Sequence, residues 1–228
     1  MTHVDIVLSA DFLNESGALI FPDIGLETIA GSPRIQHRYL DRYLAEYEPH
    51  QLSDADVLLS LKPKVTRTSL EGVSRLCAIG RFGVGYDNVD LAACNEHDIA
   101  VYITRRAVVR PVASSIVLLV LAASHNLVWK DRLIRRGDWV GSTRVLGQEP
   151  RGRVLGTVGL GNIAREALRL LRPFEFERFL AFDPLITPET AGSLGVTLSS
   201  LEALFEQCDY VLINCPLTPE TRGQLIKT

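Results

Sequence analysis

The sequence has few of the features that mark a secreted, disulfide-bonded protein. Its 228 residues include only four cysteines, which form neither a CxxC pair nor a dense framework. Three of them, Cys77, Cys208 and Cys215, sit in or beside apolar runs and are predicted to be small core residues. The first residues contain no basic segment followed by an apolar one, so no secretory signal is expected. We therefore expect a protein of a reducing, cytoplasmic setting.

An excess of positive charge is also lacking. The chain has 24 lysines and arginines against 27 acidic residues, a formal net charge of −3. This balance gives no general attraction to nucleic acid or to an anionic membrane, and neither is expected as a partner.

Metal ligands are sparse as well. Cys94 and His97 are spaced to share a helix face, but nothing nearby completes a site, so no metal is expected.

Only one stretch without charged residues approaches the length of a membrane span. Val112–Trp129 is 18 residues long but contains serine, histidine and asparagine, and it passes into the charged segment Lys130–Arg136, which Gly137 stops. We expect one long helix buried in a core or a subunit interface. His125 is then a polar residue on that helix and not a catalytic base.

Hydrophobic runs alternate with helical patterns along the chain, which predicts parallel sheets with helices on their faces. The segment 140–153 is rich in Gly, Ser, Thr and Pro and is predicted to be a connection. Strands are expected at 4–9, 57–60, 76–79, 99–103, 154–158, 178–182 and 209–213, with a weaker one near Val196. Helices are expected at 35–47, 65–73, 89–97, 163–172 and 198–207.

The most informative stretch is Gly159-x-Gly161-x-x-Ala164, which follows the apolar run Val154–Val158. This is a dinucleotide-binding pattern: Gly159 permits a tight turn, Gly161 lets the backbone approach a pyrophosphate, and Ala164 keeps the helix close to the strand. Asp183 lies 22 positions after Gly161, where a carboxylate can accept hydrogen bonds from the adenine ribose. Because Asp183 would repel a 2′-phosphate, NAD is favoured over NADP.

A second glycine pair, Gly83 and Gly85, follows the strand expected at 76–79. Ligands of open α/β sheets bind at the carboxyl ends of the strands, so these backbone N–H groups could bind one. A glycine turn capped by Asp87, Asn88 or Asp90 explains the pattern equally well. Nearby arginines could add positive potential for an anionic substrate, although solvent exposure is slightly favoured. These arginines are Arg81, Arg105, Arg106 and Arg110.

Four stretches, in this order, resemble the D-isomer-specific 2-hydroxyacid dehydrogenases, a family that includes phosphoglycerate dehydrogenases and glyoxylate/hydroxypyruvate reductases. They are Gly83–Leu91, Arg110–Ala113, the glycine fingerprint with Asp183, and Pro216–Thr221. The resemblance implies an α/β fold of two doubly wound parallel-sheet domains flanking a cleft. Residues 1–108 would form a flavodoxin-like substrate domain and residues 109–228 a Rossmann-like NAD-binding domain. Hydride transfer would take place between NAD(H) and a small 2-hydroxy or 2-keto acid.

The same resemblance assigns roles to individual residues. Val84 and Gly85 would offer backbone N–H groups to the substrate carboxylate. Val112 would lie near the nicotinamide, and the helix that starts there would pack against its partner in a homodimer. The remaining cofactor-binding residues would be Gly159, Gly161, Asn162, Ile163, Asp183, Pro184, Pro216 and Thr221.

The family also uses an Arg, a Glu and a His that follow the Pro216–Thr221 motif, and none of them occurs before Thr228. We therefore expect a C-terminally truncated chain with an incomplete NAD-binding domain, inactive by itself. Helices are expected to start at Pro219 and at Gln224–Thr228. Ser114 and Ser115, and the run from Thr104 to Arg106, depart from the common family pattern and leave the substrate undefined. The alternative is a non-catalytic NAD-binding interaction protein, similar to the corepressors related to this family.

Overall fold

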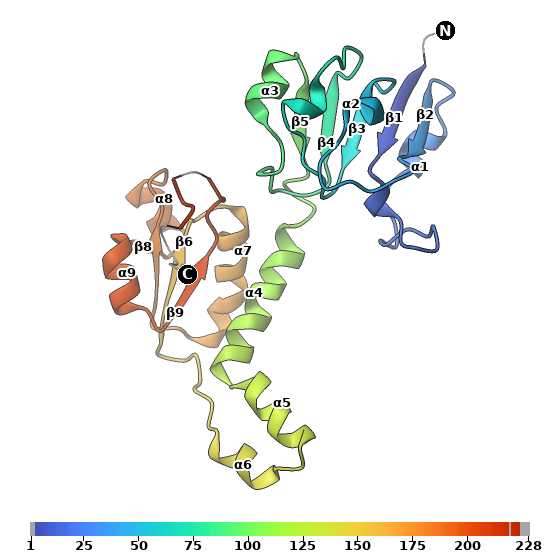
Figure 1. Cartoon of the computed structure of the whole chain (residues 1–228). Coiled ribbons are helices and arrows are strands. Elements are labelled where there is room, and N and C mark those ends of the chain that lie inside the picture. Colours follow the sequence, from blue (N-terminus) through green and yellow to red (C-terminus); the bar gives the residue numbers. More distant parts are fainter. Residues whose placement is uncertain (1–2, 219, 224–228) are drawn as a thin grey trace. The chain divides into compact units, whose positions relative to one another are not determined.

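The computed structural model describes residues 3–218 and 220–223, and the helices expected at Pro219 and Gln224–Thr228 lie outside them. The chain divides into two compact units, Met1–Ala107 and Val108–Thr228, both visible in Figure 1. The sequence-based boundary was placed one residue later, after Val108. Each unit has its own sheet and its own core.

The sheet of the first unit has five strands, and every pair is parallel. The strand order β2-β1-β3-β4-β5 is the flavodoxin-like order, which confirms the predicted fold class. The strands are β1 (Val4–Leu8), β2 (Ile35–Tyr39), β3 (Val57–Ser60), β4 (Ala78–Arg81) and β5 (Ala100–Ile103).

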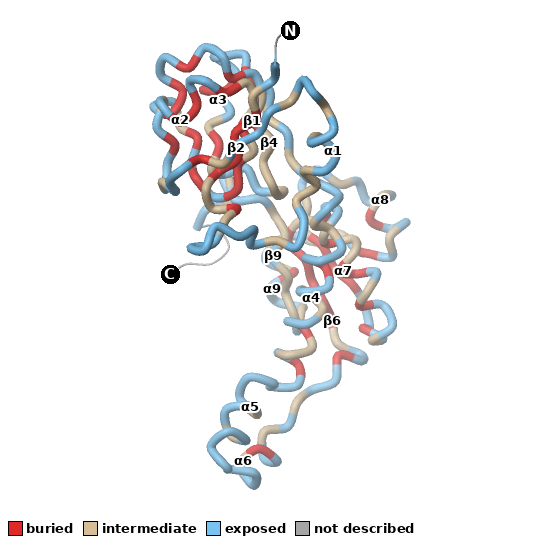
Figure 2. The backbone as a smooth tube through the Cα atoms, turned by 90° about the vertical axis from the view of Figure 1, so that its right-hand side faces the viewer, coloured by how far each residue is buried: buried red, intermediate tan, exposed pale blue. Residues whose placement is uncertain are grey.

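Side chains from both faces of this sheet are buried, as expected for a parallel sheet. Val7, Leu58 and Ile79 lie in register on three adjacent strands and are fully buried on one face. Ile6 and Leu8 point to the other face, where they pack with Phe12. Figure 2 shows buried residues in these strands and also in the helices and loops that pack beside them.

Two predicted helices of this unit are wrong. The helix expected at 35–47 is instead β2, which pairs with β1 from Ile35 opposite Val4 to Tyr39 opposite Leu8. Apolar residues four positions apart fit both a helix and a strand, so the pattern alone could not decide. The helix expected at 65–73 is reduced to a 3₁₀ turn at Thr68–Leu70, because Val65 bridges to Val89 and Gly72 adopts a φ of +71°. The helices present are α1 (Glu27–Ala30), α2 (Pro49–Leu52) and α3 (Leu91–Glu96), with a 3₁₀ turn at Ala10–Phe12.

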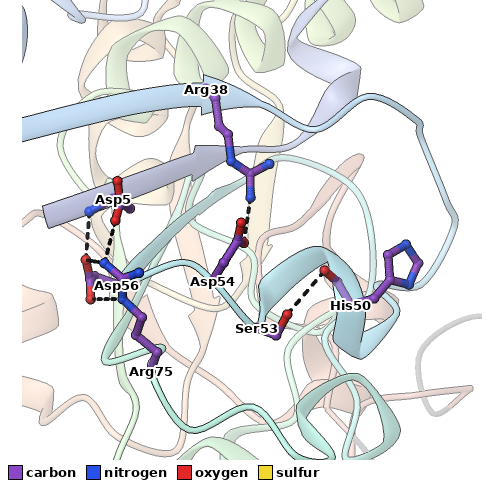
Figure 3. Close-up of polar contacts among 7 residues, drawn as sticks. All are labelled: Asp5, Arg38, His50, Ser53, Asp54, Asp56 and Arg75. Atoms are coloured by element: carbon purple, nitrogen blue, oxygen red, sulfur yellow. Dashed lines mark hydrogen bonds and ion pairs between the residues drawn. The ribbon is translucent and has the colours of Figure 1, made fainter.

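A charged cluster lies at the amino ends of β1 and β3 (Figure 3). Arg75 forms ion pairs with both Asp5 and Asp56, and an oxygen of Asp56 also accepts from the Asp5 backbone N–H at 2.7 Å. The Arg75 guanidinium holds the pKa of the Asp56 carboxyl below its usual range. Because Arg75 is exposed and both carboxylates are partly exposed, these ion pairs tie strand ends together at little net energetic gain.

The sheet of the second unit has four parallel strands in the order β8-β7-β6-β9. Numbered along the chain, this is the order 3-2-1-4 of a nucleotide-binding sheet, so the Rossmann-like prediction is also confirmed. The strands are β6 (Val154–Val158), β7 (Arg178–Phe182), β8 (Thr197–Leu198) and β9 (Tyr210–Ile213). The helices between them are α7 (Asn162–Leu171), α8 (Pro188–Ser193) and α9 (Leu201–Gln207), with a 3₁₀ turn at Arg172–Phe174. Leu198 lies in β8, so the predicted helix starts later, at the Ser200 cap.

The long helix expected from Val112 is broken. It consists of α4 (Val109–Ser124) and α5 (Leu127–Arg135), which meet at an angle of 64° because Asn126 adopts a left-handed φ of +51°. A third helix, α6 (Trp139–Arg144), occupies part of the segment predicted to be a connection, and Asp138 caps it by accepting from the Gly141 N–H at 2.7 Å. Among the described residues no single helix passes the length and hydropathy test for a membrane span, and only the bent pair α4 and α5 passes jointly.

These helices are less buried than predicted. Val120 packs into the core of the second unit, with Leu160, Ala164 and Leu168 on α7 and its loop. Leu118 and Leu119 are 61% and 66% exposed, and α5 has no buried residue. Most of this stretch is therefore not buried in the core of the chain, and its burial in a subunit interface stays a prediction. Cys77 is likewise exposed rather than buried, while Cys208 and Cys215 are half-buried.

Candidate cofactor and substrate sites

The turn after β6 places a glycine where no other residue fits. Gly159 has a φ of +91°, and its N–H donates to the Phe182 carbonyl at 2.8 Å. A Cβ at this position would lie 2.9 Å from the backbone nitrogen of Cys215 and 3.0 Å from the carbonyl carbon of Asn214. Since a backbone cannot move aside as a flexible side chain can, Gly159 is required by the close approach of the chain that follows β9.

The start of α7 is open and rich in unused donors. Gly161 is the N-cap, and a Cβ placed there would meet nothing within 4 Å. Within the described residues, the N–H groups of Gly161, Asn162 and Ile163 have no hydrogen-bond acceptor. Free N–H groups at the amino end of a ten-residue helix attract an anion through their hydrogen bonds and through the helix dipole. Ala164, fully buried, lets this helix start close to the core.

Asp183 stands at the end of β7, beside this turn. One carboxylate oxygen accepts from the Leu160 N–H at 2.8 Å, and the other accepts from the Leu185 N–H at 2.9 Å. Each oxygen keeps a further lone pair, because a carboxylate oxygen accepts up to two hydrogen bonds. The half-buried carboxylate is therefore fixed in place and can still accept from two hydroxyl groups. Pro184, next in the chain, is exposed.

The segment after β9 folds back on itself. The Thr221 hydroxyl donates to the Pro216 carbonyl at 2.7 Å, and the same oxygen accepts from the Thr218 N–H at 2.8 Å. Pro216 and Thr221, two of the predicted cofactor residues, are thus joined in one closed turn at the carboxyl end of β9. Val112, by contrast, lies in the first turn of α4, on a separate element, and is 38% exposed.

Two residues that the sequence analysis missed hold this edge of the sheet together. Thr157, fully buried in β6, donates to the Gly159 carbonyl at 2.9 Å and accepts from the Asn214 side-chain amide at 3.0 Å. The pair connects the glycine turn to the segment after β9. The available signal was a threonine inside an otherwise apolar strand, since a buried hydroxyl requires a hydrogen-bond partner.

An ion-pair network fixes α7 against α4. Glu166 on α7 accepts from Arg169 and from Arg110 of α4, each at 2.8 Å. Arg169 first, and then Arg110, lower the pKa of Glu166 to about 2. Arg110 is therefore ion-paired, but Glu166 is shared by two arginines and the three groups together keep one positive charge.

In the first unit, the turn after β4 carries the two predicted substrate-binding residues. Val84 is half-buried and Gly85 exposed, and neither N–H has an acceptor among the described residues. The helix-cap alternative is also present, because Asp90 caps α3 by accepting from the Ala93 N–H at 2.9 Å. The two explanations concern different residues of one loop and are compatible.

Apart from Val112 on α4, the predicted site residues form two groups. Those around the glycine turn, from Gly159 to Thr221, gather at the carboxyl ends of β6, β7 and β9 in the second unit. Val84 and Gly85 belong to the first unit. Arg105 and Arg106 are exposed, as the sequence analysis favoured, but Arg81 is half-buried. Among the described residues no cluster of three or more metal-binding side chains occurs.

Residues 117–228 match the family model described as the NAD-binding domain of D-isomer specific 2-hydroxyacid dehydrogenases. A D-3-phosphoglycerate dehydrogenase of Methanocaldococcus jannaschii is 33% identical over 218 residues, which are 95% of this chain and 39% of that protein. Residues 117–228 belong to the D-isomer-specific 2-hydroxyacid dehydrogenase family. A glyoxylate reductase of Korarchaeum cryptofilum is 30% identical over 210 residues, covering 88% of this chain and 61% of that protein. The chain therefore spans about two fifths to three fifths of the length of these curated relatives.

Solved structures of dehydrogenases and reductases have a similar fold. A glyoxylate reductase from Paecilomyes thermophila superposes with a TM-score of 0.80 at 24% identity, covering 99% of this chain and 69% of that one. An NAD-dependent formate dehydrogenase from Staphylococcus aureus, solved with NAD, gives a TM-score of 0.78 at 25% identity, covering 96% of this chain and 67% of that one. The second unit is thus an NAD-binding domain by family as well as by geometry.

Proposed function

We propose that this protein is an NAD-dependent oxidoreductase that acts on a small 2-hydroxy or 2-keto acid. The observation that carries the proposal is the β6–turn–α7 arrangement, in which free N–H groups at a helix start lie beside a fixed carboxylate, Asp183. This arrangement matches the two chemical demands of a dinucleotide: an anionic pyrophosphate and a ribose with two hydroxyl donors.

The residues present fit NAD. The N–H groups of Gly161, Asn162 and Ile163 would bind the pyrophosphate, since Gly161 leaves open space there. Asp183 would accept from the ribose hydroxyls and would repel a 2′-phosphate. Pro184, Pro216 and Thr221 would line the adenosine side, and Val112 the nicotinamide side. When bound, NAD supplies the hydride acceptor or donor of the reaction.

The free N–H groups of Val84 and Gly85 would bind the carboxylate that all 2-hydroxy and 2-keto acids share. Backbone N–H groups at the carboxyl end of a parallel strand are well placed to bind such an anion. This chemistry selects a carboxylate but does not choose among glyoxylate, hydroxypyruvate and 3-phosphohydroxypyruvate.

None of the histidines of the chain occurs in either glycine turn. His97 ends α3, where its Nδ1 lies 2.9 Å from the Ala93 carbonyl, and His125 ends α4. We infer that these 228 residues supply binding rather than proton transfer, and that the chain alone turns over no 2-keto acid. The alternative from another class is a non-catalytic NAD-binding interaction protein.

Two measurements on the purified chain test the proposal. Titration followed by NADH fluorescence should show saturable binding, with NADPH binding at least tenfold more weakly because of Asp183. NADH oxidation over the three keto acids should show no turnover. Absence of NADH binding would refute the cofactor assignment, and clear turnover would refute the inferred lack of an acid/base.

We further propose a homodimer formed through α4 and α5. Leu118, Leu119, Val128 and Trp129 are each more than half exposed, a density of apolar side chains typical of an interface. A two-fold interface would bury the same patch on both copies. Sedimentation of the chain should show a dimer, and Leu119→Asp should shift it to a monomer with unchanged NADH affinity. A monomeric wild-type chain would refute this assignment.

A further inference from the structure

Arg165 on α7 lies beside the turn after β6 without a counter-ion. It is the fourth residue of the helix and is half-buried. In the part of the chain that the structure describes it forms no ion pair, and the neighbouring Glu166 is engaged with Arg110 and Arg169. A half-buried cation without a counter-ion is costly, so its position calls for a reason.

The side chain of Arg165 reaches back to the residue between the two glycines of the turn. Its Nε donates to the carbonyl of Leu160 at 2.8 Å, and within the described residues this carbonyl accepts no other hydrogen bond. Leu160 is fully buried. A buried carbonyl requires a donor, and Arg165 supplies it from five positions further along the chain.

The first peptide group of this turn, which joins Gly159 to Leu160, is held at both of its polar atoms. Its carbonyl accepts from the Thr157 hydroxyl at 2.9 Å. Its N–H donates to the Asp183 carboxylate at 2.8 Å. Both polar atoms are therefore used inside the chain, and the orientation of this peptide plane is fixed.

The second peptide group, which joins Leu160 to Gly161, is held at one atom only. Its carbonyl accepts from Arg165, and its N–H has no acceptor among the described residues. The peptide is trans and planar, so its C=O and N–H point in opposite directions. The bond from Arg165 therefore fixes the direction of the Gly161 N–H, which points away from the guanidinium and is left for a ligand.

The charge of Arg165 also opposes that of Asp183. The two side chains bond opposite ends of the same residue, since Asp183 accepts from the Leu160 N–H and Arg165 donates to the Leu160 carbonyl. A carboxylate suits the ribose of a dinucleotide, but its negative charge repels the pyrophosphate of the same ligand. A positive charge on the next peptide reduces this repulsion, and a half-buried charge is screened less than an exposed one.

We propose that Arg165 is a positioning residue for the cofactor: its bond to the Leu160 carbonyl directs the Gly161 N–H toward the pyrophosphate, and its charge offsets that of Asp183. It acts through the backbone of the turn, and Gly161 makes the contact. The inference rests on the proposed function, in which this turn binds the pyrophosphate of NAD. It adds that the affinity of the turn for this anion depends on a side chain outside the Gly-x-Gly pattern.

The test uses the full 228-residue chain and ¹H–¹⁵N spectra. ADP-ribose is titrated as a ligand that carries the pyrophosphate, and adenosine as a ligand that shares its base and ribose but lacks the pyrophosphate. The shifts of the N–H signals give a dissociation constant for each. Arg165→Gln removes the charge, and Arg165→Lys keeps it. Arg169→Gln is the matched control, because it removes an equal charge one turn further along α7, where the side chain bonds Glu166 and not the turn.

We expect Arg165→Gln to raise the dissociation constant of ADP-ribose about tenfold, as loss of a charge in a half-buried setting implies. Arg165→Lys should raise it about threefold, because an ammonium keeps the charge but bonds a carbonyl less rigidly than a planar guanidinium. Arg169→Gln should change it by less than about twofold, since solvent screens an exposed charge. Adenosine should bind equally to all four proteins.

Three results would overturn the proposal. Equal ADP-ribose affinity in the wild type and Arg165→Gln would show that Arg165 does not serve the pyrophosphate. Equal losses of ADP-ribose and adenosine affinity would show that it only supports the fold. Equal losses in Arg165→Gln and Arg169→Gln would show that only the total charge of α7 counts. If Arg165→Gln does not fold, the selective loss of ADP-ribose affinity in Arg165→Lys decides, and its absence overturns the proposal.

Failure of the cofactor assignment gives a different result. Absence of ADP-ribose shifts in the wild type would refute both the assignment and the inference. The three results above would instead leave a wild-type chain that binds ADP-ribose, so the proposed function would stand without a role for Arg165.

Discussion

The two units carry the same short pattern, Gly-x-Gly, at the same kind of place. Gly83 and Gly85 follow β4, and Gly159 and Gly161 follow β6, and each strand lies inside a parallel sheet with neighbours on both sides. Yet the two turns continue differently. α7 starts directly after Gly161 and runs for ten residues, whereas α3 starts only at Leu91 and runs for six. Only the turn after β6 can therefore present the start of a helix, α7, to an anion.

The glycines themselves face different neighbours. At Gly159 the neighbouring atoms belong to the backbone after β9, so any side chain would force two segments of the fold apart. At Gly83 the neighbouring atoms belong to the guanidinium of Arg81. The first glycine is needed for packing, and the second leaves room for a charge. The Gly-x-Gly pattern therefore indicates in both turns that other atoms come close to the backbone, but it does not indicate which atoms these are.

The largest expected effect separates Gly159 from Gly161, the two glycines of the turn after β6, which is called the cofactor turn below. Gly159→Ala places a side chain at a φ of +91° and against backbone atoms, so we expect a loss of about 1–3 kcal/mol in unfolding free energy from the strained conformation alone. NADH binding should be abolished. Denaturant unfolding and NADH fluorescence measure the two quantities.

Gly161→Ala is the matched control for Gly159→Ala. Its Cβ would have open space, so unfolding free energy should change by no more than about 0.5–1 kcal/mol, while NADH affinity falls because the Cβ stands where the pyrophosphate approaches. If both variants lost stability equally, the argument from backbone contact would be wrong.

The next effect concerns the acid of the cofactor turn. The place of Asp183 at a strand end would by itself predict that Asp183→Ala weakens NADH binding and leaves the fold intact. The structure predicts otherwise: the carboxylate accepts from Leu160 and Leu185, and Leu160 is fully buried. We expect Asp183→Ala to cost about 1–3 kcal/mol of unfolding free energy and to weaken NADH binding at least tenfold.

Asp183→Asn separates the two roles of this carboxylate. The amide oxygen still accepts one backbone bond, so most stability should return, while NADH affinity stays reduced because one ribose acceptor and the charge are gone. Full NADH affinity in Asp183→Asn would contradict the ribose assignment.

The sequence predicted the elements around the turn after β6 accurately. The strand Val154–Val158 was predicted to the residue, because a continuous apolar run, a glycine turn and a helix pattern all agree there. β2 was predicted as a helix, because its ends, Ile35 and Tyr39, fit either period and its pairing with β1 is not encoded locally. The break at Asn126 was missed for a related reason: one left-handed residue is enough to end a helix, and the apolar pattern runs through it.

Contacts between distant segments account for what was missed in the sites. The hydrogen bonds of Thr157 to Gly159 and Asn214 join residues up to 57 positions apart, and no local pattern predicts them. Arg81 was recognised as a possible source of charge, but solvent exposure was favoured for it. It is half-buried beside a turn that is held by Phe12, Phe82 and Thr104, which come from three different segments of the chain. Spacing predicts which N–H groups are free, and packing decides what lies beneath them.

The smallest expected effect compares the acids of the two turns. Asp183 is held by two backbone N–H groups, whereas Asp87 is exposed, lies close to Gly85 and makes no hydrogen bond within the described residues. A negative charge beside the substrate turn opposes a bound carboxylate, but solvent screens it. We therefore expect Asp87→Asn to strengthen D-glycerate binding only about twofold, as measured by titration followed in ¹H–¹⁵N spectra. NADH affinity, measured by fluorescence, should be unchanged. Weaker glycerate binding in Asp87→Asn would mean that Asp87 supports the turn after β4, as Asp183 supports the turn after β6. The two turns would then differ only in Arg81, which precedes the first of them, and in the helix that follows each.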